Sequence, residues 1–155
     1  MLKRIGVLSV LAGIAAVSVG FGFPEFSPAD DKAKSKKPKG TKIISADSQF
    51  GKIIYDGKGQ AIYLFDRETS SKPRCYDACA VAWPPVLTKG RPFAAKGVRG
   101  KLIGTTKRRG GGNQVTYNGH PLYYYVDEPP RTVLCHNVYS YDGLWKVLHP
   151  SGKPE

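Results

Sequence analysis

The pattern of apolar and polar positions along the chain predicts short β-strands joined by turns. Two pairs of apolar and aromatic segments each flank a turn dipeptide: residues 52–55 and 61–65 flank Asp56-Gly57, and residues 114–117 and 122–125 flank Asn118-Gly119. Asp-Gly or Asn-Gly between strand-like segments is the strongest local signal for a β-hairpin. The chain therefore predicts two related hairpins, the first of them preceded by a lead-in over residues 43–50.

The segments around these hairpins predict further short elements. Residues 102–106, 133–141 and 144–148 have strand-like composition. Residues 77–83 predict one short helical turn near a cysteine pair, ended by two prolines that cannot donate backbone hydrogen bonds. Residues 88–101 alternate glycine with lysine and arginine, which predicts a long surface loop. The fold class that follows is all-β, a small antiparallel sandwich or open barrel built on the two hairpins.

Composition agrees with this fold class. The chain has 155 residues, which allows one domain with a modest core once an N-terminal export segment is set aside. Its 18 glycines and 12 prolines are too many for a helical bundle, whereas 9 tyrosines and 6 phenylalanines suit strands and tight turns. We expect a single β domain over residues 43–155.

The N-terminal segment predicts export. Lys3 and Arg4 precede residues 5–23, which hold no charged side chain, and this order matches the basic and apolar regions of a signal peptide. Cleavage is expected before Asp30, with an earlier site after Gly20 as the alternative. The apolar run also approaches the ~17 to 25 residues that can span a bilayer, so residues 1–29 are either a cleaved signal or an uncleaved anchor. The predicted location is extracellular or at the cell envelope.

Residues 30–42 predict a disordered basic tether. They hold six lysines and two aspartates but no large apolar residue, so they cannot bury enough surface to fold. The whole chain carries a net charge of +12 at pH 7. A charge of this size favours anionic partners.

Several residues recur in the two halves in a specific order. A tyrosine is followed by an aromatic residue two positions later and by an acid three positions after that. The first half also holds two cysteines followed by Trp-Pro-Pro, and the second half holds Tyr-Asn-Gly ahead of its aromatic run. The residues are Tyr63, Phe65, Glu68, Cys75, Cys79, Trp83, Pro84, Pro85, Tyr117, Gly119, Tyr123, Tyr125 and Glu128.

With these motifs the chain resembles the bacterial secreted-repeat, or predicted lipoprotein, family of unknown function with the Y-x-(F/W/Y)-x-x-D motif. The resemblance covers about residues 50–150, and both motif acids are glutamate where the family usually has aspartate. No cysteine lies near the N-terminal segment, so the resemblance does not extend to the acylated cysteine of the lipoprotein branch. The family has no established activity and implies no reaction.

The three cysteines are disulfide candidates, since disulfides persist outside the cytoplasm. Cys75 and Cys79 are close enough to bridge across a turn, and we expect a structural staple because C-x-x-x-C is not the redox C-x-x-C motif. Cys135 is then left over, although it could instead pair with Cys75 or Cys79. The sequence does not choose among these pairings.

A metal site is the sharper alternative for these cysteines together with His120, His136 and His149. Adjacent Cys135 and His136 would point to opposite faces of a strand, so both cannot easily bind one ion. We therefore predict no metal and no cofactor, and copper would be the first metal to test in an exported protein.

Enzymatic motifs are lacking, since the chain has no G-x-S-x-G, H-E-x-x-H or P-loop sequence. The acids Asp66 and Glu68, and Asp127 and Glu128, could act as acid and base, but we interpret them as solvated carboxylates at strand ends. Most aromatic side chains are expected in the core, with Trp83 and Trp145 as its large anchors.

The basic surface gives the main functional prediction. Between Ala78 and Val126 the chain holds eight lysines and arginines but no acid. We predict a non-enzymatic protein that binds an anionic envelope polymer or membrane surface, and no specific nucleic acid. The alternative is an extracytoplasmic thiol redox or copper-binding protein. The candidate polyanion-binding residues are Lys32, Lys34, Lys36, Lys37 and Lys39 of the tether and Lys107, Arg108 and Arg109 of a later turn.

Overall fold

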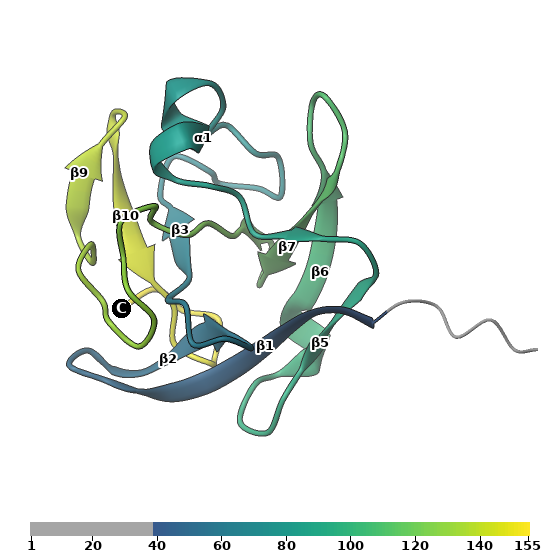
Figure 1. Cartoon of the computed structure of the whole chain (residues 1–155), viewed down its shortest axis with the longest axis vertical. Coiled ribbons are helices and arrows are strands. Elements are labelled where there is room, and N and C mark those ends of the chain that lie inside the picture. The colour runs from purple at the N-terminus through teal and green to yellow at the C-terminus, as the bar shows by residue number, and fades with distance from the viewer. Residues whose placement is uncertain (1–38) are drawn as a thin grey trace, which may run out of the picture. The chain divides into compact units, whose positions relative to one another are not determined.

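A computed structural model describes residues 39–155, which lie within one compact unit (Figure 1). The predicted signal segment 1–29 and residues 30–38 of the predicted tether lie outside the described residues. Strand β1 begins at Lys39, so the folded domain begins four residues before the predicted start at Ile43. The elements in chain order are β1 (Lys39–Ser48), β2 (Gly51–Asp56), β3 (Tyr63–Phe65), α1 (Ala78–Ala82), β4 (Leu87–Thr88), β5 (Arg91–Ala94), the 3-10 helix η1 (Gly100–Leu102), β6 (Ile103–Lys107), β7 (Asn113–Tyr117), β8 (His120–Pro121), β9 (Val138–Ser140) and β10 (Gly143–Val147).

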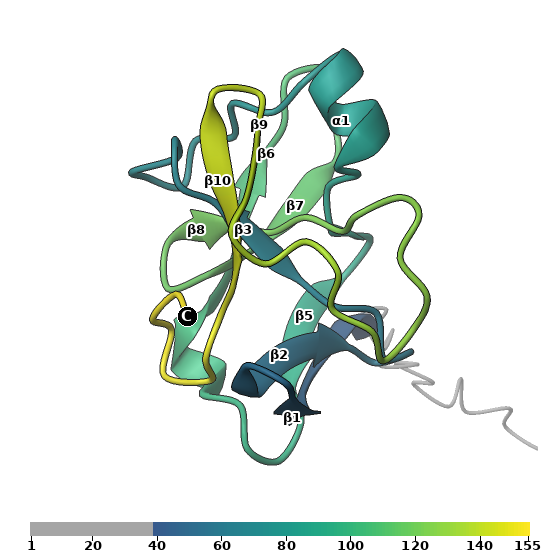
Figure 2. The same ribbon diagram turned by 90° about the vertical axis from the view of Figure 1, so that its left-hand side faces the viewer.

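The strands form three small sheets, which confirms the all-β prediction. Their orders are β2-β1-β5, β3-β10-β9 and β4-β7-β6, and β8 adds to β7. All strand pairs are antiparallel except β1 and β5, which run parallel. Figure 2 shows β1, β2 and β5 at one end of the domain and α1 at the other. Within residues 39–155 the sheets do not close into a barrel.

The second predicted hairpin is confirmed at its turn, but its returning strand β8 is His120–Pro121 rather than residues 122–125, and Tyr123 instead bridges to Tyr63 and Pro85. The turn at Asn118-Gly119 joins β7 to β8, and it places Tyr117 opposite His120. The φ angles of Asn118 and Gly119 are +48° and +83°, and a two-residue hairpin turn of this kind requires positive values at both positions.

The first predicted hairpin is wrong in its pairing. Strand β2 pairs with β1 along its whole length and meets the segment after its turn only at a single bridge between Tyr55 and Ala61. Strand β3 instead pairs with β10. The other edge of β3 is also taken by a distant segment, since Tyr63 bridges to Tyr123.

Two other segments also differ from prediction. Residues 88–101 contain β5 and the start of η1 rather than one long loop. The predicted strand over residues 133–141 shrinks to β9, because Asn137 has a φ of +59° and the Val138 N–H bonds back to the Cys135 carbonyl, which interrupts an extended chain. The predicted helical turn is confirmed as α1.

The two repeats meet at an approximate two-fold axis. Tyr63 and Tyr123 exchange both backbone hydrogen bonds, each with an N to O distance of 2.9 Å, and such an antiparallel pair is itself two-fold symmetric. Beside them Trp83 stacks on Trp145, with ring centroids 3.9 Å apart and an interplanar angle of 2°. Tyr63 meets Trp83 edge-on at 5.3 Å, and Tyr123 meets Trp145 in the same way at 5.3 Å. The repeat seen in the sequence is therefore a repeat in space.

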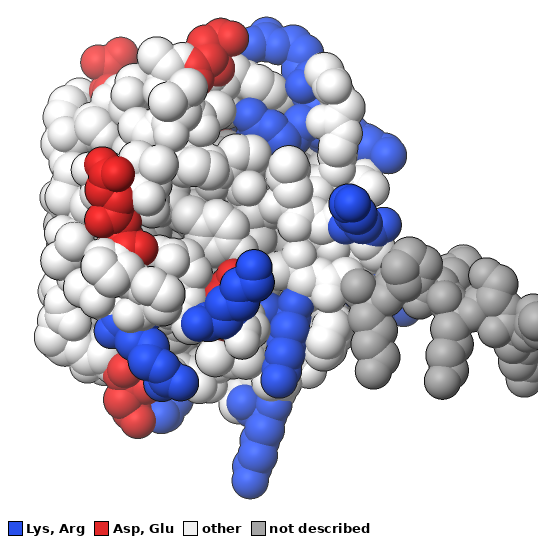
Figure 3. Space-filling model, in the orientation of Figure 1, with Lys and Arg blue, Asp and Glu red and all other residues white. Residues whose placement is uncertain are grey.

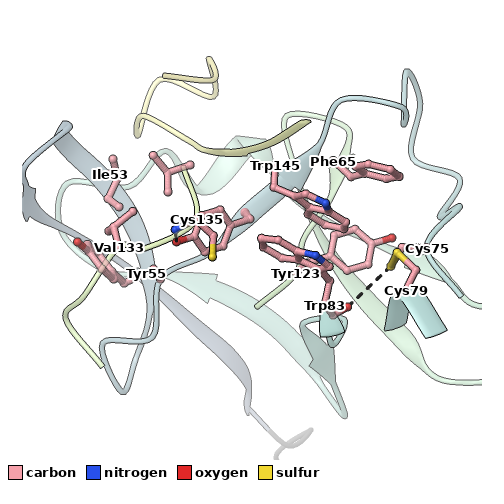
Figure 4. Packing of buried hydrophobic residues seen from close by; sticks show 13 residues of the cluster. Ile53, Tyr55, Phe65, Cys75, Cys79, Trp83, Tyr123, Val133, Cys135 and Trp145 are labelled. Atoms are coloured by element: carbon pink, nitrogen blue, oxygen red, sulfur yellow. Dashed lines mark hydrogen bonds between the residues drawn. A yellow bond between two sulfur atoms is a disulfide. The ribbon is translucent and has the colours of Figure 1, made fainter. Parts of the chain in front are cut away.

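This aromatic cluster is the centre of one of two apolar cores (Figure 4). Tyr63 and Phe65 of β3 belong to it, whereas Ile62 and Leu64 belong to the second core, so alternate residues of one strand serve both. Trp83 and Trp145 are 1% and 0% exposed, which confirms them as core anchors. The second core comprises Ile43, Ile54, Ile62, Leu64, Val86, Val115, Tyr117, Leu122 and Leu148.

We expect either half of the tryptophan stack to be needed for stability. Trp83→Ala or Trp145→Ala should lower the free energy of unfolding by about 3–5 kcal/mol, because each removes a large buried ring and leaves a cavity. Urea denaturation followed by circular dichroism checks this. Tyr139→Ala is the control, since Tyr139 is 68% exposed and its loss should cost under about 0.5 kcal/mol. Equal losses for the control and the tryptophan variants would contradict the assignment.

Candidate functional site

The two motif glutamates are buried and joined across the repeats. The Tyr63 hydroxyl donates to Glu128 Oε1 at 2.6 Å, and the Tyr123 hydroxyl donates to Glu68 Oε1 at 2.6 Å. Each tyrosine therefore serves the acid of the other repeat. Glu68 is 1% exposed and Glu128 is 5% exposed, so the prediction that they are solvated strand-end carboxylates was wrong.

A local turn brings each carboxyl inward. The Glu68 N–H bonds to the Phe65 carbonyl, and the side chain then accepts the backbone N–H of Arg74 at 2.6 Å. Glu128 accepts the N–H of Leu134, which lies six positions after it as Arg74 does after Glu68, also at 2.6 Å. Sequence reasoning missed this because acids at strand ends usually face water; the only signal was the repeated spacing.

Burial raises the pKa of both Glu68 and Glu128, and the N–H and O–H donors offset this in part. The second oxygen, Oε2, of each carboxyl is buried without a hydrogen-bond partner among the described residues. Burial also raises the pKa of Tyr63 and of Tyr123. Such enclosed groups hold the fold together and offer little access to a substrate.

The cysteines give one staple and one thiol. Cys75 and Cys79 form a disulfide with a Cα–Cα distance of 5.3 Å, which confirms the expected pairing and excludes the two pairings through Cys135. Cys135 is buried, and Figure 4 shows it on the opposite side of the aromatic cluster from the disulfide. Burial, and secondly the nearby Glu128 charge, raises the pKa of Cys135 to about 11. A thiol of this kind is a poor redox group.

The three histidines make separate contacts, although His136 directly follows Cys135 in the chain. His120 Nδ1 is 3.3 Å from the Glu68 carbonyl, the His136 ring packs on Phe50, and His149 Nδ1 lies 2.9 Å from the Ser151 hydroxyl. Over residues 39–155 no three His, Cys, Asp or Glu side chains come together in a way that could hold a metal ion.

The three cations of the turn Lys107-Arg108-Arg109 differ in how far they are available for binding. The Arg108 guanidinium donates to Gln114 Oε1 and to the Cys75 carbonyl, both at 2.7 Å, and stacks over the Tyr76 ring. Arg108 is therefore bound into the fold rather than free for a polyanion. Lys107 and Arg109 are exposed. Of the predicted tether residues, only Lys39 falls among the described ones, as the first residue of β1.

A groove of about 990 Å³ lies between β5 and β6. Its walls carry two exposed cations, Lys89 and Arg91, together with the half-exposed Phe93, and no acid. Sequence reasoning missed the groove because residues 88–101 were interpreted as a loop, although their charge pattern was noticed. The full lining is Lys89, Gly90, Arg91, Pro92, Phe93, Ala94, Gly100, Ile103, Gly104, Thr105 and Asn113.

The cations around this groove have no carboxylate partner. Throughout residues 39–155 the one salt bridge joins Lys52 to Asp47, outside the basic stretch. Figure 3 shows Lys and Arg gathered on the side of β6 and along the lower edge, whereas Asp and Glu lie mainly toward β9, β10 and α1. The exposed cations of the acid-free stretch are Lys89, Arg91, Lys96, Arg99, Lys101, Lys107 and Arg109.

Comparison of the chain with protein-family models, curated proteins and solved structures finds no match. The resemblance to the secreted-repeat family stays a prediction. In the described part of the chain, no helix has the length and apolar character needed to cross a membrane.

The buried glutamates predict a specific pH dependence. The pKa of both glutamates is raised in the folded state, so the folded protein holds protons that the unfolded chain releases. Their contribution to the free energy of unfolding is therefore most favourable below the ordinary glutamate pKa, and it is lost as pH rises through the pKa of the folded state. The double variant Glu68→Gln/Glu128→Gln should therefore show a smaller fall in unfolding free energy between about pH 4 and pH 8 than the wild type. Urea titrations at each pH measure this. Identical slopes would refute it.

Cys135 should be nearly inert in the folded protein. With a pKa of about 11, its thiolate fraction at pH 8 is roughly a hundredfold below that of an ordinary cysteine. Reaction with a chromogenic disulfide reagent should therefore be at least about a hundredfold faster in denaturant than in buffer. Comparable rates in both would show an accessible, reactive thiol.

Proposed function

We propose that this chain is an exported, non-enzymatic binding domain of the cell envelope, and that its basic face holds an anionic polymer or membrane surface. The observation that carries the proposal is the acid-free stretch, whose exposed lysines and arginines lie on and around the groove between β5 and β6 without carboxylate partners among the described residues. Seven of its eight cations are exposed. A surface of one sign attracts polyanions over a distance of about one Debye length, ~10 Å at 0.1 M salt.

The N-terminal sequence supports the proposed location, since a basic segment and an apolar run precede the folded domain. Phosphate-bearing polymers and anionic lipid headgroups are the polyanions that such a location offers. The lysines of residues 30–42 would add charge next to the start of β1.

The absence of an assembled acid–base pair among residues 39–155 supports a binding role over catalysis. Glu68 and Glu128 are buried and their Oε1 atoms accept tyrosine and backbone donors, and Cys75 and Cys79 are joined in a disulfide. The contact between His149 and the Ser151 hydroxyl belongs to a local turn, since His149 Nδ1 also accepts the Ser151 N–H. The exposed charge of the basic stretch is the feature to which we assign binding.

Matched lysine variants test the proposal on the full chain. Lys89, Lys96 and Lys101 changed together to Gln should weaken binding to vesicles of anionic lipid, or to polyphosphate, by about 3 kcal/mol, roughly a hundredfold, at low salt. Lys58, Lys72 and Lys153 changed to Gln remove the same charge outside the stretch and should weaken binding much less.

Raising the salt concentration should abolish wild-type binding, because surface charges are screened. Equal losses in the two triple variants, or binding that resists salt, would contradict the proposed basic face.

A further inference from the structure

The outer edge of β6 is an unpaired strand edge. On its inner side β6 pairs with β7, and the Asn118 N–H bonds to the Leu102 carbonyl at 2.9 Å. In an antiparallel ladder the bonded residues alternate, so Gly104 bonds toward β7 while the N–H and C=O groups of Ile103 and Thr105 point outward. The Ile103 N–H is already bonded to the Gly100 carbonyl at the end of η1. Within residues 39–155, no backbone hydrogen bond reaches the Ile103 C=O or the N–H and C=O groups of Thr105 on this outer side.

These outward groups face the groove. Ile103, Gly104 and Thr105 form one wall, and β5 forms the other. The groove narrows where Gly100 lies against Ala94, since a Cβ built on Gly100 would be 3.6 Å from the Ala94 Cβ. On β5 the proline Pro92 has no N–H, a common protection of edge strands, whereas β6 carries no proline. The edge left able to pair is β6.

The positive charges around β6 favour a partner that carries negative charge. Lys101 and Lys107 are exposed at either end of the strand, and Lys89 and Arg91 are exposed on the groove wall. Phe93 and Ile103 add apolar surface between them. An occupant should therefore be extended, acidic at some positions and apolar at others.

We propose that β6 takes up an extended acidic segment of a partner polypeptide as an added β-strand. A peptide strand offers donors and acceptors at the spacing of β6, so it can satisfy the Ile103 C=O and both the N–H and the C=O of Thr105. Ionised polyphosphate offers acceptors only and would leave both carbonyls unpaired. This inference goes beyond the proposed affinity for polyanions and does not rest on it, because it depends on backbone pairing rather than on charge alone.

Hydrogen exchange with a designed probe tests the added strand. The probe is a capped octapeptide of alternating Glu and Val, added to the full chain at moderate salt. Amide exchange of Thr105, followed by NMR, should slow at least about tenfold when the peptide is bound, and amides of β9 should not change. Unchanged exchange at Thr105 would overturn the proposal.

N-methylated peptides separate strand pairing from charge. One version of the probe is methylated on its odd-numbered amides and the other on its even-numbered amides. Only one of these two sets can face β6, and the version that is methylated on that set should bind at least about tenfold more weakly. Binding of both versions within twofold of the parent, or equal protection of the Thr105 amide by polyphosphate, would assign the groove to electrostatic contact alone and overturn the added strand.

Two sets of variants locate the site. Thr105→Pro removes one outward N–H and should weaken peptide binding about tenfold, with thermal unfolding used to show that the variant is folded. Should Thr105→Pro fail to fold, Lys101→Glu/Lys107→Glu tests the same edge, with Lys58→Glu/Lys153→Glu as the charge-matched control. Equal peptide affinity in these two charge variants would place the peptide elsewhere and contradict the proposal.

Discussion

The fold depends on two hydrogen bonds that cross between the repeats. A buried carboxyl group must be supplied with donors, and here the tyrosine donor of each acid comes from the other half of the chain. Each repeat supplies its own glutamate with backbone N–H donors, and the side-chain donor comes from the other repeat. The same crossing fixes the backbone pair between Tyr63 and Tyr123 and sets the distance at which Trp83 meets Trp145. The two halves therefore form one cooperative unit.

The two repeats share the crossed tyrosine–glutamate pairs and the tryptophan stack at their centre, but the segments that follow in each repeat differ in structure. Cys75 and Cys135 lie 60 positions apart in the chain, and both are followed two positions later by a residue of positive φ, Asp77 or Asn137. In the first repeat a disulfide and α1 follow, whereas in the second repeat the chain continues into β9. The basic groove lies on β5 and β6, away from the shared centre. Any binding role of the groove thus belongs to β5 and β6, which take no part in the two-fold arrangement of the tyrosines and tryptophans.

Local signals in the sequence were enough where the structure is local. The Asn118-Gly119 turn and the short α1 follow from neighbouring residues. The spacing of Cys75 and Cys79 favoured their bridge but left pairing through Cys135 open. The pairing of β3 with β10 could not be predicted, because a strand buried on both faces has no polar face to set its partner. The burial of Glu68 and Glu128 also escaped prediction, since the donors that make it tolerable lie in the opposite repeat. The groove follows from the position of β5, whose parallel pairing with β1 has no sequence signature.

Double-mutant cycles in unfolding free energy test the central claim most directly. Tyr→Phe and Glu→Met changes, which remove the donor and the acceptor respectively, are combined in all four pairs of Tyr63 or Tyr123 with Glu68 or Glu128. The crossed contacts predict a coupling energy of about 1–3 kcal/mol for Tyr63 with Glu128 and for Tyr123 with Glu68, and near zero for the two pairs within a repeat. Coupling within the repeats, or in none of the four pairs, would contradict an architecture that depends on crossed tyrosine–glutamate hydrogen bonds.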